Sequence, residues 1–495
     1  MKRKILISII IIVSQFAWLN AQSNRILYYM NLPQKRNLNP ALTSSDSVYI
    51  GLPGISGIGI NLNNNILNFQ DVLMRGQSDS LVTFLHPSVN IEDFISRIKD
   101  RNFIEPELTI PVFSLAFPVK KGYIFFDVNE RAEMNAVIPG SLIELGLRGN
   151  GSYAGDYVDL SNFRAGMKIY HEIGLGFSRK YSTKLRAGFK GKVLFGLANF
   201  SVTPSSLGIR ISDDYSHTLD ADLTVNMSGP INITRDEANH IKDIQPDEDL
   251  MLNTLMLKGP KNLGFAVDMG ATYMLTKKIM LSAAVTDLGF INWKSNVTNL
   301  RTNDVYKFDG FDITGVMNGD RTFDQVTSGI ADSLKESFSF TETNDPFRTM
   351  LPTGLNLGAS YNLSKNFSLG LLSSSRIIGK QVREALTVST NLRLGTMVST
   401  SLSYTAANHR FDNIGAGLML RMSIFQFYVL TDNIPIFWNK LVSFDDRGNP
   451  ESTIYLPDNW NTVDLKFGMN LVFGHRKARK AAKFVPEGQT VPGNK

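Results

Sequence analysis

The chain has 495 residues, of which 43% are hydrophobic and 19% charged, and it contains 39 Gly, 31 Phe and no Cys. This composition is too apolar for a disordered protein and too poor in charge for a coiled coil. The absence of Cys excludes disulfide frameworks, thiol catalysis and cysteine metal sites. The six His residues show no spacing of three or four residues, so no zinc site is indicated. We therefore expect neither a metal nor a cofactor.

Residues 1–21 are predicted to form a secretory signal peptide. Lys2, Arg3 and Lys4 make up the basic first part, residues 5–13 the apolar core, and Ala21 is a small residue at the expected cleavage site. The alternative, a retained anchor helix, is disfavoured because the apolar stretch is short and interrupted by polar residues. The mature chain is therefore expected outside the cytoplasm, where no nucleic acid partner is anticipated.

The net charge of +6 is concentrated at the two ends of the chain. Besides the signal peptide, the tail 475–495 is basic and then contains Pro and Gly, so we expect it to be disordered in the periplasm. The body between these ends is slightly acidic and offers no basic surface to a nucleic acid. No mature segment has 18 consecutive apolar residues, so we expect no transmembrane helix.

Alternating apolar and polar residues run through most of the mature chain. From Phe163 to Phe177 every odd position except His171 is apolar, whereas the even positions are mostly charged or Gly. Neighbouring side chains of a strand point to opposite faces, so one face is apolar over 15 residues. A tilted strand needs roughly 9–11 residues to cross a bilayer. The same pattern recurs in 185–197, 263–285, 355–371 and 463–473.

Two further regularities favour a membrane barrel over a secreted all-β sandwich. Short turns at 120–122, 180–184, 276–278 and 362–366 alternate with long loops at 64–106, 137–160, 229–260, 293–349 and 432–461. Aromatic residues that could form an interfacial girdle flank the short turns: Tyr123, Phe177, Tyr181, Tyr273, Tyr361 and Phe367.

These patterns predict an all-β, antiparallel transmembrane β-barrel of about 14 strands (12–16) over residues 48–474, in the outer membrane. Residues 205–228 either add two strands or form a hairpin above the membrane. Helical spacing in 91–98 and 326–338 predicts short helices in the outer loops.

Several short motifs resemble those of FadL-like outer-membrane barrels. They are Asn39-Pro40-Ala41, residues 264–270, Asp287-Leu288-Gly289 with Trp293, and residues 430–435. The chain looks most similar to a large, functionally unassigned outer-membrane family of Bacteroidota. The resemblance implies that residues 22–47 plug the lumen. FadL-like relatives include diffusion channels for hydrophobic molecules and accessory barrels of the type IX secretion apparatus.

The predicted lumen face of the strands 163–177 and 185–197 carries many charges. They form a candidate lumen charge cluster: Arg164, Lys168, Glu172, Arg186, Lys190 and Lys192. A hairpin that closes around Ser182 would place Glu172 opposite Lys192. The cluster is either a polar filling that satisfies itself or a constriction that attracts anions.

Glu130 departs from its pattern, because it falls among apolar residues that would face lipid. A bulge that turns the carboxylate inward is the first explanation. A kink that opens the wall sideways, which the resemblance implies for the third strand, is the second. His171 also lies on a lipid-facing stripe, but no Ser accompanies it, and no nucleophile, base and orienting group can be assembled. We therefore predict no enzyme.

Two functional hypotheses remain. The first is a plugged diffusion channel or transporter for small hydrophobic solutes. The second is a non-conducting accessory or scaffold barrel of a cell-surface or type IX secretion complex. Outer-membrane lipid is the expected surrounding in both, and other outer-membrane proteins are the partners in the second. A continuous apolar path through the lumen would favour the first, and a filled interior the second.

Overall fold

A computed structural model describes residues 25–475 except 45, 67, 69–73, 76–80, 83–89, 121, 215, 236–240, 248–261, 309–339, 380, 408–409, 436–437, 445–449 and 458–461. The predicted signal peptide, the tail beyond His475 and the predicted helix at 326–338 lie outside these residues. Among the described residues, no helix has the length and apolar character to span a membrane.

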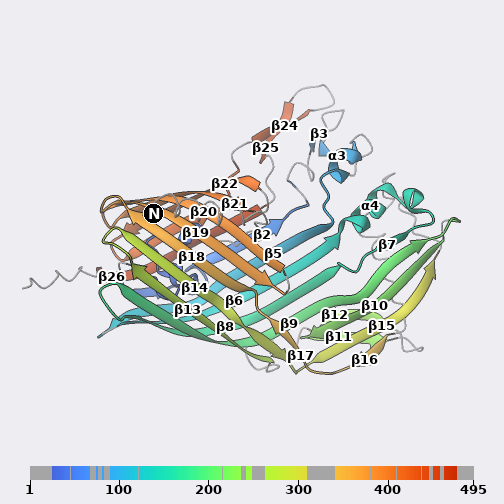
Figure 1. The fold of residues 1–495 in the computed structure, drawn as a ribbon, viewed down its shortest axis with the longest axis horizontal. Helices are drawn as coiled ribbons and strands as arrows, with labels where there is room; N and C mark the ends of the chain where they lie inside the picture. Colours follow the sequence, from blue (N-terminus) through green and yellow to red (C-terminus); the bar gives the residue numbers. More distant parts are fainter. Residues whose placement is uncertain are drawn as a thin grey trace, which may run out of the picture.

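Fourteen antiparallel strands close into a barrel, which confirms the predicted fold class (Figure 1). The first strand consists of β1 (Asp46–Gly51) and β2 (Ile58–Asn64), and both pieces pair with β5 on one side and with β26 on the other. In order, the others are β5 (Arg101–Val119), β6 (Gly122–Pro139), β8 (Arg164–Lys180), β9 (Leu185–Ile211), β13 (Asn262–Met274), β14 (Ile279–Trp293), β17 with β18 (Phe347–Met350 and Thr353–Asn362), β19 (Phe367–Ile378), β20 (Gln381–Leu394), β21 (Val398–Ala407), β22 (Arg410–Met422), β23 (Phe425–Thr431) and β26 (Thr462–His475).

The barrel is apolar outside and polar inside. Leu175, Phe265 and Leu357 on the outer face are 61%, 53% and 50% exposed, whereas Asp268 and Lys190 on the inner face are 0% and 1% exposed. A belt of exposed large apolar side chains is stable only against hydrocarbon, and closure leaves no unpaired barrel edge in lipid. The protein is therefore an outer-membrane barrel.

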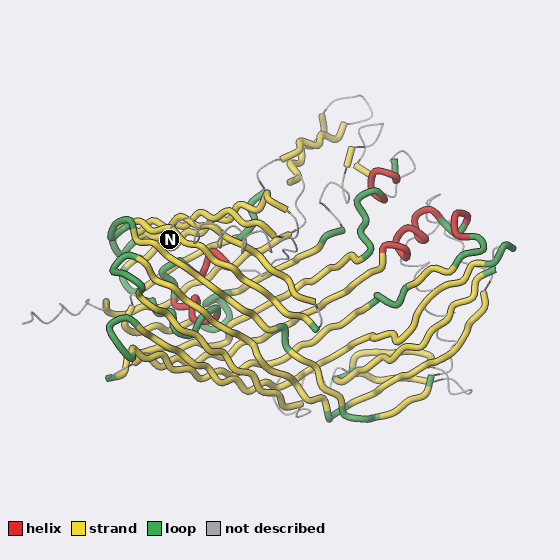
Figure 2. Tube along the Cα trace, in the orientation of Figure 1, coloured by secondary structure: helices red, strands yellow, loops and turns green. Residues whose placement is uncertain are grey.

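Short turns, drawn in green in Figure 2, lie together at one end of the barrel. In outer-membrane barrels the end with the short turns faces the periplasm. The predicted strict alternation of short and long connections is wrong, because β19–β20 and β21–β22 are also joined by two-residue connections at the opposite end. Tyr123 does not join the aromatic girdle. It lies at an inward position of β6 and is buried, whereas Tyr181, Tyr273 and Tyr361 are exposed.

A smaller sheet extends from the outer end of the barrel, to the right in Figure 1. Pairing of β9 with β13 ends at Gly196, and from Asn199 onward β9 pairs with β10 (His217–Ser228) instead. The sheet continues through β15 (Val297–Phe308) and β16 (Thr341–Thr343), and β7 (Tyr157–Asp159) flanks β9. Residues 205–228 thus form the predicted hairpin outside the membrane, and part of the predicted loop 293–349 is strand. We call these strands the extension.

The remaining elements are short. The helices are α3 (Ile91–Ile95), as predicted within 91–98, α4 (Gly140–Arg148) and η3 (Gly151–Tyr153). Three small hairpins are formed by β3 (Met74–Arg75) with β4 (Leu81–Val82), β11 (Ile231–Arg235) with β12 (Ile241–Pro246), and β24 (Trp438–Phe444) with β25 (Pro450–Pro457).

Residues 25–44, which we call the plug segment, lie inside the barrel. They contain the 3-10 helices η1 (Arg25–Tyr28) and η2 (Pro33–Asn37). Ile26, Met30 and Leu32 pack against Met419 and Leu430 of the inner wall. The resemblance implied a plug of residues 22–47; of these, residues 25–44 lie inside the barrel, and β1 already begins at Asp46.

Candidate functional site

Glycines in the inner wall make room for the plug segment. A Cβ at Gly188 of β9 would overlap with the carbonyl group of Pro40, and one at Gly270 of β13 with the side chain of Asn39. Asn39 Oδ1 accepts a hydrogen bond from the Ala41 backbone N–H at 2.9 Å, and Asn39 Nδ2 lies 3.3 Å from the Ala283 carbonyl oxygen. The Asn-Pro-Ala motif therefore docks the plug segment onto β9, β13 and β14.

Ten charged side chains form one connected network in the lumen. They are Arg36 of the plug segment, Asp127, Arg131 and Glu133 of β6, Lys168 and Glu172 of β8, Lys190 and Lys192 of β9, Asp268 of β13 and Asp287 of β14. Five are basic and five acidic, so the network carries no net charge. Buried charges persist only when they are paired in this way, and the balance favours the polar filling over an anion-attracting constriction.

Glu172 and Lys192 are at the centre of this network. Glu172 lies 3.2 Å from Arg131 and 3.3 Å from Lys190. Lys192 lies 2.8 Å from Asp268 and 2.5 Å from Asp287. The four partners come from four different strands, so the network ties the walls of β6, β8, β9, β13 and β14 together.

Arg36 connects the network to the plug segment. Its Nη2 lies 2.6 Å from Asp127, and both side chains are buried. Its guanidinium carbon also lies 4.8 Å from the centre of the Tyr49 ring. Burial opposes the charge of Arg36, but Asp127 and Tyr49 favour it more strongly, so the pKa of Arg36 lies above its ordinary value.

The predicted hairpin register is wrong by two residues. Lys180 pairs with Arg186, so residues 181–185 separate the paired positions, and Glu172 is opposite Leu194, not Lys192. Glu172 nevertheless reaches Lys192 diagonally, at 3.8 Å. Of the predicted cluster, the structure brings Lys168, Glu172, Lys190 and Lys192 together.

Two predicted members lie elsewhere. Arg164 is near the outer end of β8 and donates to the backbone carbonyl oxygens of Ser161 and Phe163 at 2.7 and 2.5 Å. Arg186 is at the short-turn end and lines a cavity beside the plug segment.

Six of the ten members of the network were missed by the sequence analysis: Arg36, Asp127, Arg131, Glu133, Asp268 and Asp287. Asp127, Arg131 and Glu133 occupy inward positions of a strand that was examined only for Glu130. Their spacing of two and four residues was a usable signal. Asp287 was harder to find, because it has a φ of 56° where the β13–β14 register shifts, and this irregularity changes which way its side chain points.

Glu130 stays on the outer face of the barrel. It pairs in register with His171 of β8, and its carboxylate contacts His171 Nδ1. The prediction that a bulge turns Glu130 inward is therefore wrong, because pairing between β6 and β8 is continuous through this position. The irregularity lies in β5 instead, between Pro111 and Phe113. The Glu130 carboxylate is stabilised on the outer face because the buried His171 imidazole contacts it.

The first strand is interrupted beside this irregularity. Residues 52–57 leave the strand between β1 and β2. From Gly51 to Ile58 the chain advances seven residues, whereas the partner on β26 advances only three, from Asn470 to Phe467. Gln34 of the plug segment holds the interruption from inside, because its Nε2 lies 2.7 Å from the Ser56 carbonyl oxygen and 2.8 Å from Asn470 Oδ1. Tyr428 donates to the same carbonyl oxygen at 2.9 Å.

Two ion pairs cross the lumen near its outer end. Arg383 of β20 lies 2.6 Å from Glu105 of β5, and Arg376 of β19 contacts Glu107 of β5. The strand β5 is second in the barrel and β19 and β20 are ninth and tenth, so these pairs join opposite walls. These ion pairs lie toward the outer end of the lumen, and the plug segment lies at the other end.

Residues 40–432 match a protein family described as "Family of unknown function (DUF5723)". The chain belongs to this family. The match spans most of the chain, and it confirms the predicted relation to a functionally unassigned family. No curated protein matches the chain.

Among solved structures, the chain is similar to FadL-like channels. The toluene transporter TbuX of Ralstonia pickettii is 7% identical, with a TM-score of 0.40 over 93% of this chain and 100% of that one. A Pseudomonas aeruginosa FadL homologue is 11% identical, with a TM-score of 0.40 over 92% and 99%. The Pseudomonas putida toluene transporter TodX is 8% identical, with a TM-score of 0.37 over 90% and 94%. The barrel fold of this DUF5723 protein is established from the strand pairing of the chain itself, not from these similarities.

Proposed function

We propose that this protein is a closed, non-conducting outer-membrane barrel that anchors a binding surface for another cell-surface or secretion protein. The observation that carries the proposal is the filled lumen. The plug segment, the neutral network and the pairs Arg376–Glu107 and Arg383–Glu105 lie in it.

The extension supplies the surface. It places exposed side chains of β15 beyond the membrane, among them Arg301, Asn303, Val305 and Lys307, and Val305 is 57% exposed. We infer that Val305, an exposed apolar side chain beside Arg301, Asn303 and Lys307, forms part of the contact with the partner.

The first experiment tests closure. Full-length protein reconstituted in planar bilayers is expected to show no steady conductance at positive or at negative voltage. Step-like conductance of the wild-type chain would contradict the closed barrel.

The second experiment tests the surface. A photo-crosslinking amino acid replaces Val305 in cells, and, as the matched control, Leu175, which is similarly exposed but faces lipid. We expect a discrete protein adduct from position 305 and none from position 175. Equal or absent protein adducts at the two positions would remove the support for a partner on the extension.

A second candidate function is passage of small hydrophobic solutes through the wall. A groove of about 480 Å³ lies on the outer face, where Leu418, Phe427, Phe467 and Met469 surround Ile55 of the interrupted first strand. An interrupted wall beside an apolar groove would suit lateral exit into the membrane. In proteoliposomes, Ile55→Trp should slow uptake of a hydrophobic fluorescent solute, whereas Leu175→Trp should not. Equal uptake by the two variants and by protein-free vesicles would exclude this function.

A further inference from the structure

Three short turns that follow one another around the barrel share one local conformation. They connect β8 with β9, β13 with β14 and β18 with β19 at the short-turn end (Figure 2). In each turn one hydroxyl oxygen accepts two backbone N–H groups, at 2.9–3.2 Å: Ser182 from Lys184 and Leu185, Thr276 from Lys278 and Ile279, and Ser364 from Asn366 and Phe367. We call residues 181–184, 275–278 and 363–366 together the basic arc.

Backbone hydrogen bonds join each turn of the basic arc to the neighbouring strand of the wall. One contact recurs three times: the Lys184 carbonyl oxygen accepts from the Met274 N–H at 2.9 Å, that of Lys278 from Asn362 at 2.8 Å, and that of Asn366 from Arg393 at 2.8 Å. Because each turn is held both by its own hydroxyl group and by the next strand, the three turns present their side chains from fixed positions.

The basic arc combines exposed cations with exposed apolar side chains. Its lysines are all exposed: Lys184, Lys277, Lys278 and Lys365. Neither the three turns nor the six residues on either side of each contain an acidic residue. The residue before each hydroxyl side chain is large, mainly apolar and exposed: Tyr181, Leu275 and Leu363. The order Tyr, any residue, Leu, Thr or Ser, Lys occurs in both 273–277 and 361–365.

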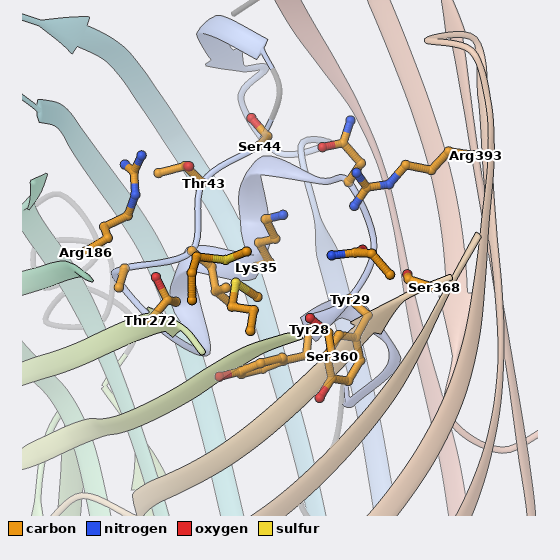
Figure 3. Close-up of a pocket in the computed structure, with 16 residues that line it drawn as sticks. Tyr28, Tyr29, Lys35, Thr43, Ser44, Arg186, Thr272, Ser360, Ser368 and Arg393 are labelled. Carbon is orange, nitrogen blue, oxygen red and sulfur yellow. The ribbon is translucent and has the colours of Figure 1, made fainter. Parts of the chain in front are cut away.

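This order of side chains fits the boundary between hydrocarbon and headgroups. The exposed Tyr273 and Tyr361 end the outer faces of β13 and β18, and Tyr is favoured at this level of a bilayer. Lysines just beyond them can lay their aliphatic stems along apolar surface and place the ammonium groups among phosphates. Arg186, two residues beyond Lys184, is not part of the basic arc, because it lines the cavity beside the plug segment (Figure 3).

We propose that the basic arc binds the headgroups of anionic phospholipids in the leaflet that faces the periplasm. The lysines attract the phosphate groups, and the Tyr and Leu side chains contact the upper parts of the acyl chains. Basic residues beside a membrane attract anionic lipid in this way, and each contributes separately. The inference is independent of the proposed partner surface, which lies at the opposite end of the barrel.

The experiment uses two spin-labelled lipids as probes, anionic phosphatidylglycerol and zwitterionic phosphatidylcholine. The full-length protein is reconstituted in vesicles of phosphatidylcholine, and electron paramagnetic resonance measures the fraction of each probe that the barrel immobilises. We expect phosphatidylglycerol to associate about fivefold more strongly than phosphatidylcholine at low ionic strength, the preference that one lysine at a membrane surface supplies. High salt should reduce this preference, because it screens exposed charges.

Two quadruple variants with equal loss of charge decide where the anionic lipid binds. The arc variant combines Lys184→Gln, Lys277→Gln, Lys278→Gln and Lys365→Gln, and its preference should fall to within about twofold of none. The control variant changes four exposed lysines of the opposite end and should keep the wild-type preference: Lys99→Gln, Lys294→Gln, Lys307→Gln and Lys440→Gln. Heat-modifiable gel mobility verifies folding, and Lys277→Gln with Lys278→Gln alone replaces the arc variant if that variant is unfolded.

Two results would overturn the proposal. One is a wild-type barrel without preference for phosphatidylglycerol, and the other is an equal loss of preference in the two quadruple variants. Cell-wall polymer is the alternative anionic partner at this end of the barrel. If the wild-type protein sediments with purified peptidoglycan, the arc variant does not, and neither shows a lipid preference, the basic arc binds the polymer and not phospholipid.

Discussion

Asp127 illustrates how much depends on single buried charges in this lumen. It lies between Arg36 at 2.6 Å and Lys190 at 3.2 Å, and it is fully enclosed. Each of its two partners belongs to a different element, one to the plug segment and one to β9. A neutral side chain at this position would leave the lumen network with an excess positive charge that water cannot reach.

Asp127→Asn should therefore lower the free energy of unfolding by about 3–5 kcal/mol. The measurement is urea unfolding in detergent, followed by heat-modifiable gel mobility. Asp220→Asn, an equal change of charge at an exposed position of the extension, should shift it by less than about 0.5 kcal/mol. Equal effects of the two changes would contradict the assigned role of the network.

Glycine has a comparable role where the plug segment meets the wall. Gly188→Ala places a methyl group where the Pro40 carbonyl group lies, and backbone cannot move aside cheaply. At Gly191, in the same strand, an added methyl group would meet only the Phe189 ring, at 3.7 Å.

The chain contains no Cys, so a single introduced thiol reports on docking of the plug segment. With Ala41→Cys as the reporter, Gly188→Ala should speed maleimide labelling about tenfold or more, which corresponds to about 1.4 kcal/mol of lost docking energy. Gly191→Ala should label at the parent rate. Unchanged labelling in both would mean that the Asn-Pro-Ala motif does not hold the plug segment in place.

At the scale of elements, the plug segment and the first strand depend on each other. Residues 52–57 lack regular pairing with β26, and their Ser56 carbonyl oxygen is held by Gln34 and Tyr428. Isolated backbone hydrogen bonds, Met469 N–H to the Ile55 carbonyl oxygen and Gly54 N–H to the Pro111 carbonyl oxygen, hold this segment in place of a continuous ladder. Such a segment opens more easily than the strands beside it.

Gln34→Ala should therefore loosen residues 52–57 selectively. Each lost hydrogen bond contributes about 1 kcal/mol, so we expect amide hydrogen exchange in this segment to accelerate about tenfold or more. The amides of β19 and β20, which pair continuously, serve as the internal reference. Acceleration spread evenly over the barrel would instead point to global destabilisation.

At the scale of the whole molecule, the proposed closed barrel has two closures in series. The plug segment fills the short-turn end, and the pairs of Glu105 and Glu107 with arginines of β20 and β19 cross the outer end. Flow through two closures in series requires that both open. Removal of either closure alone should leave the barrel without conductance.

Glu105→Gln combined with Glu107→Gln should show no conductance in planar bilayers, because the plug segment remains. The same pair of changes in a chain that lacks residues 25–44 should produce step-like conductance, provided that gel mobility shows a folded barrel. Glu92→Gln, an exposed change in α3, is the matched control. Conductance from the double variant with the plug segment present would show that one closure suffices.

The alternation of side chains by itself determined the barrel, its membrane setting and the number of strands. This was possible because lipid selects every second residue along a strand, and that period is legible in residues 163–177 without any partner strand. The prediction of a plug segment came from the family resemblance carried by Asn39-Pro40-Ala41. Its contacts with Gly188 and Gly270 could be identified only from the folded structure.

Only the tertiary structure decided what the inward side chains meet. A turn of one more or one fewer residue changes every cross-strand partner, which is why Glu172 was assigned the wrong opposite residue. Contacts across the lumen, such as Arg383 with Glu105, join residues 278 positions apart and leave no periodic trace. The lumen network and the cavity beside the plug segment arise from such contacts, because closure of the barrel brings together strands that the chain order keeps far apart.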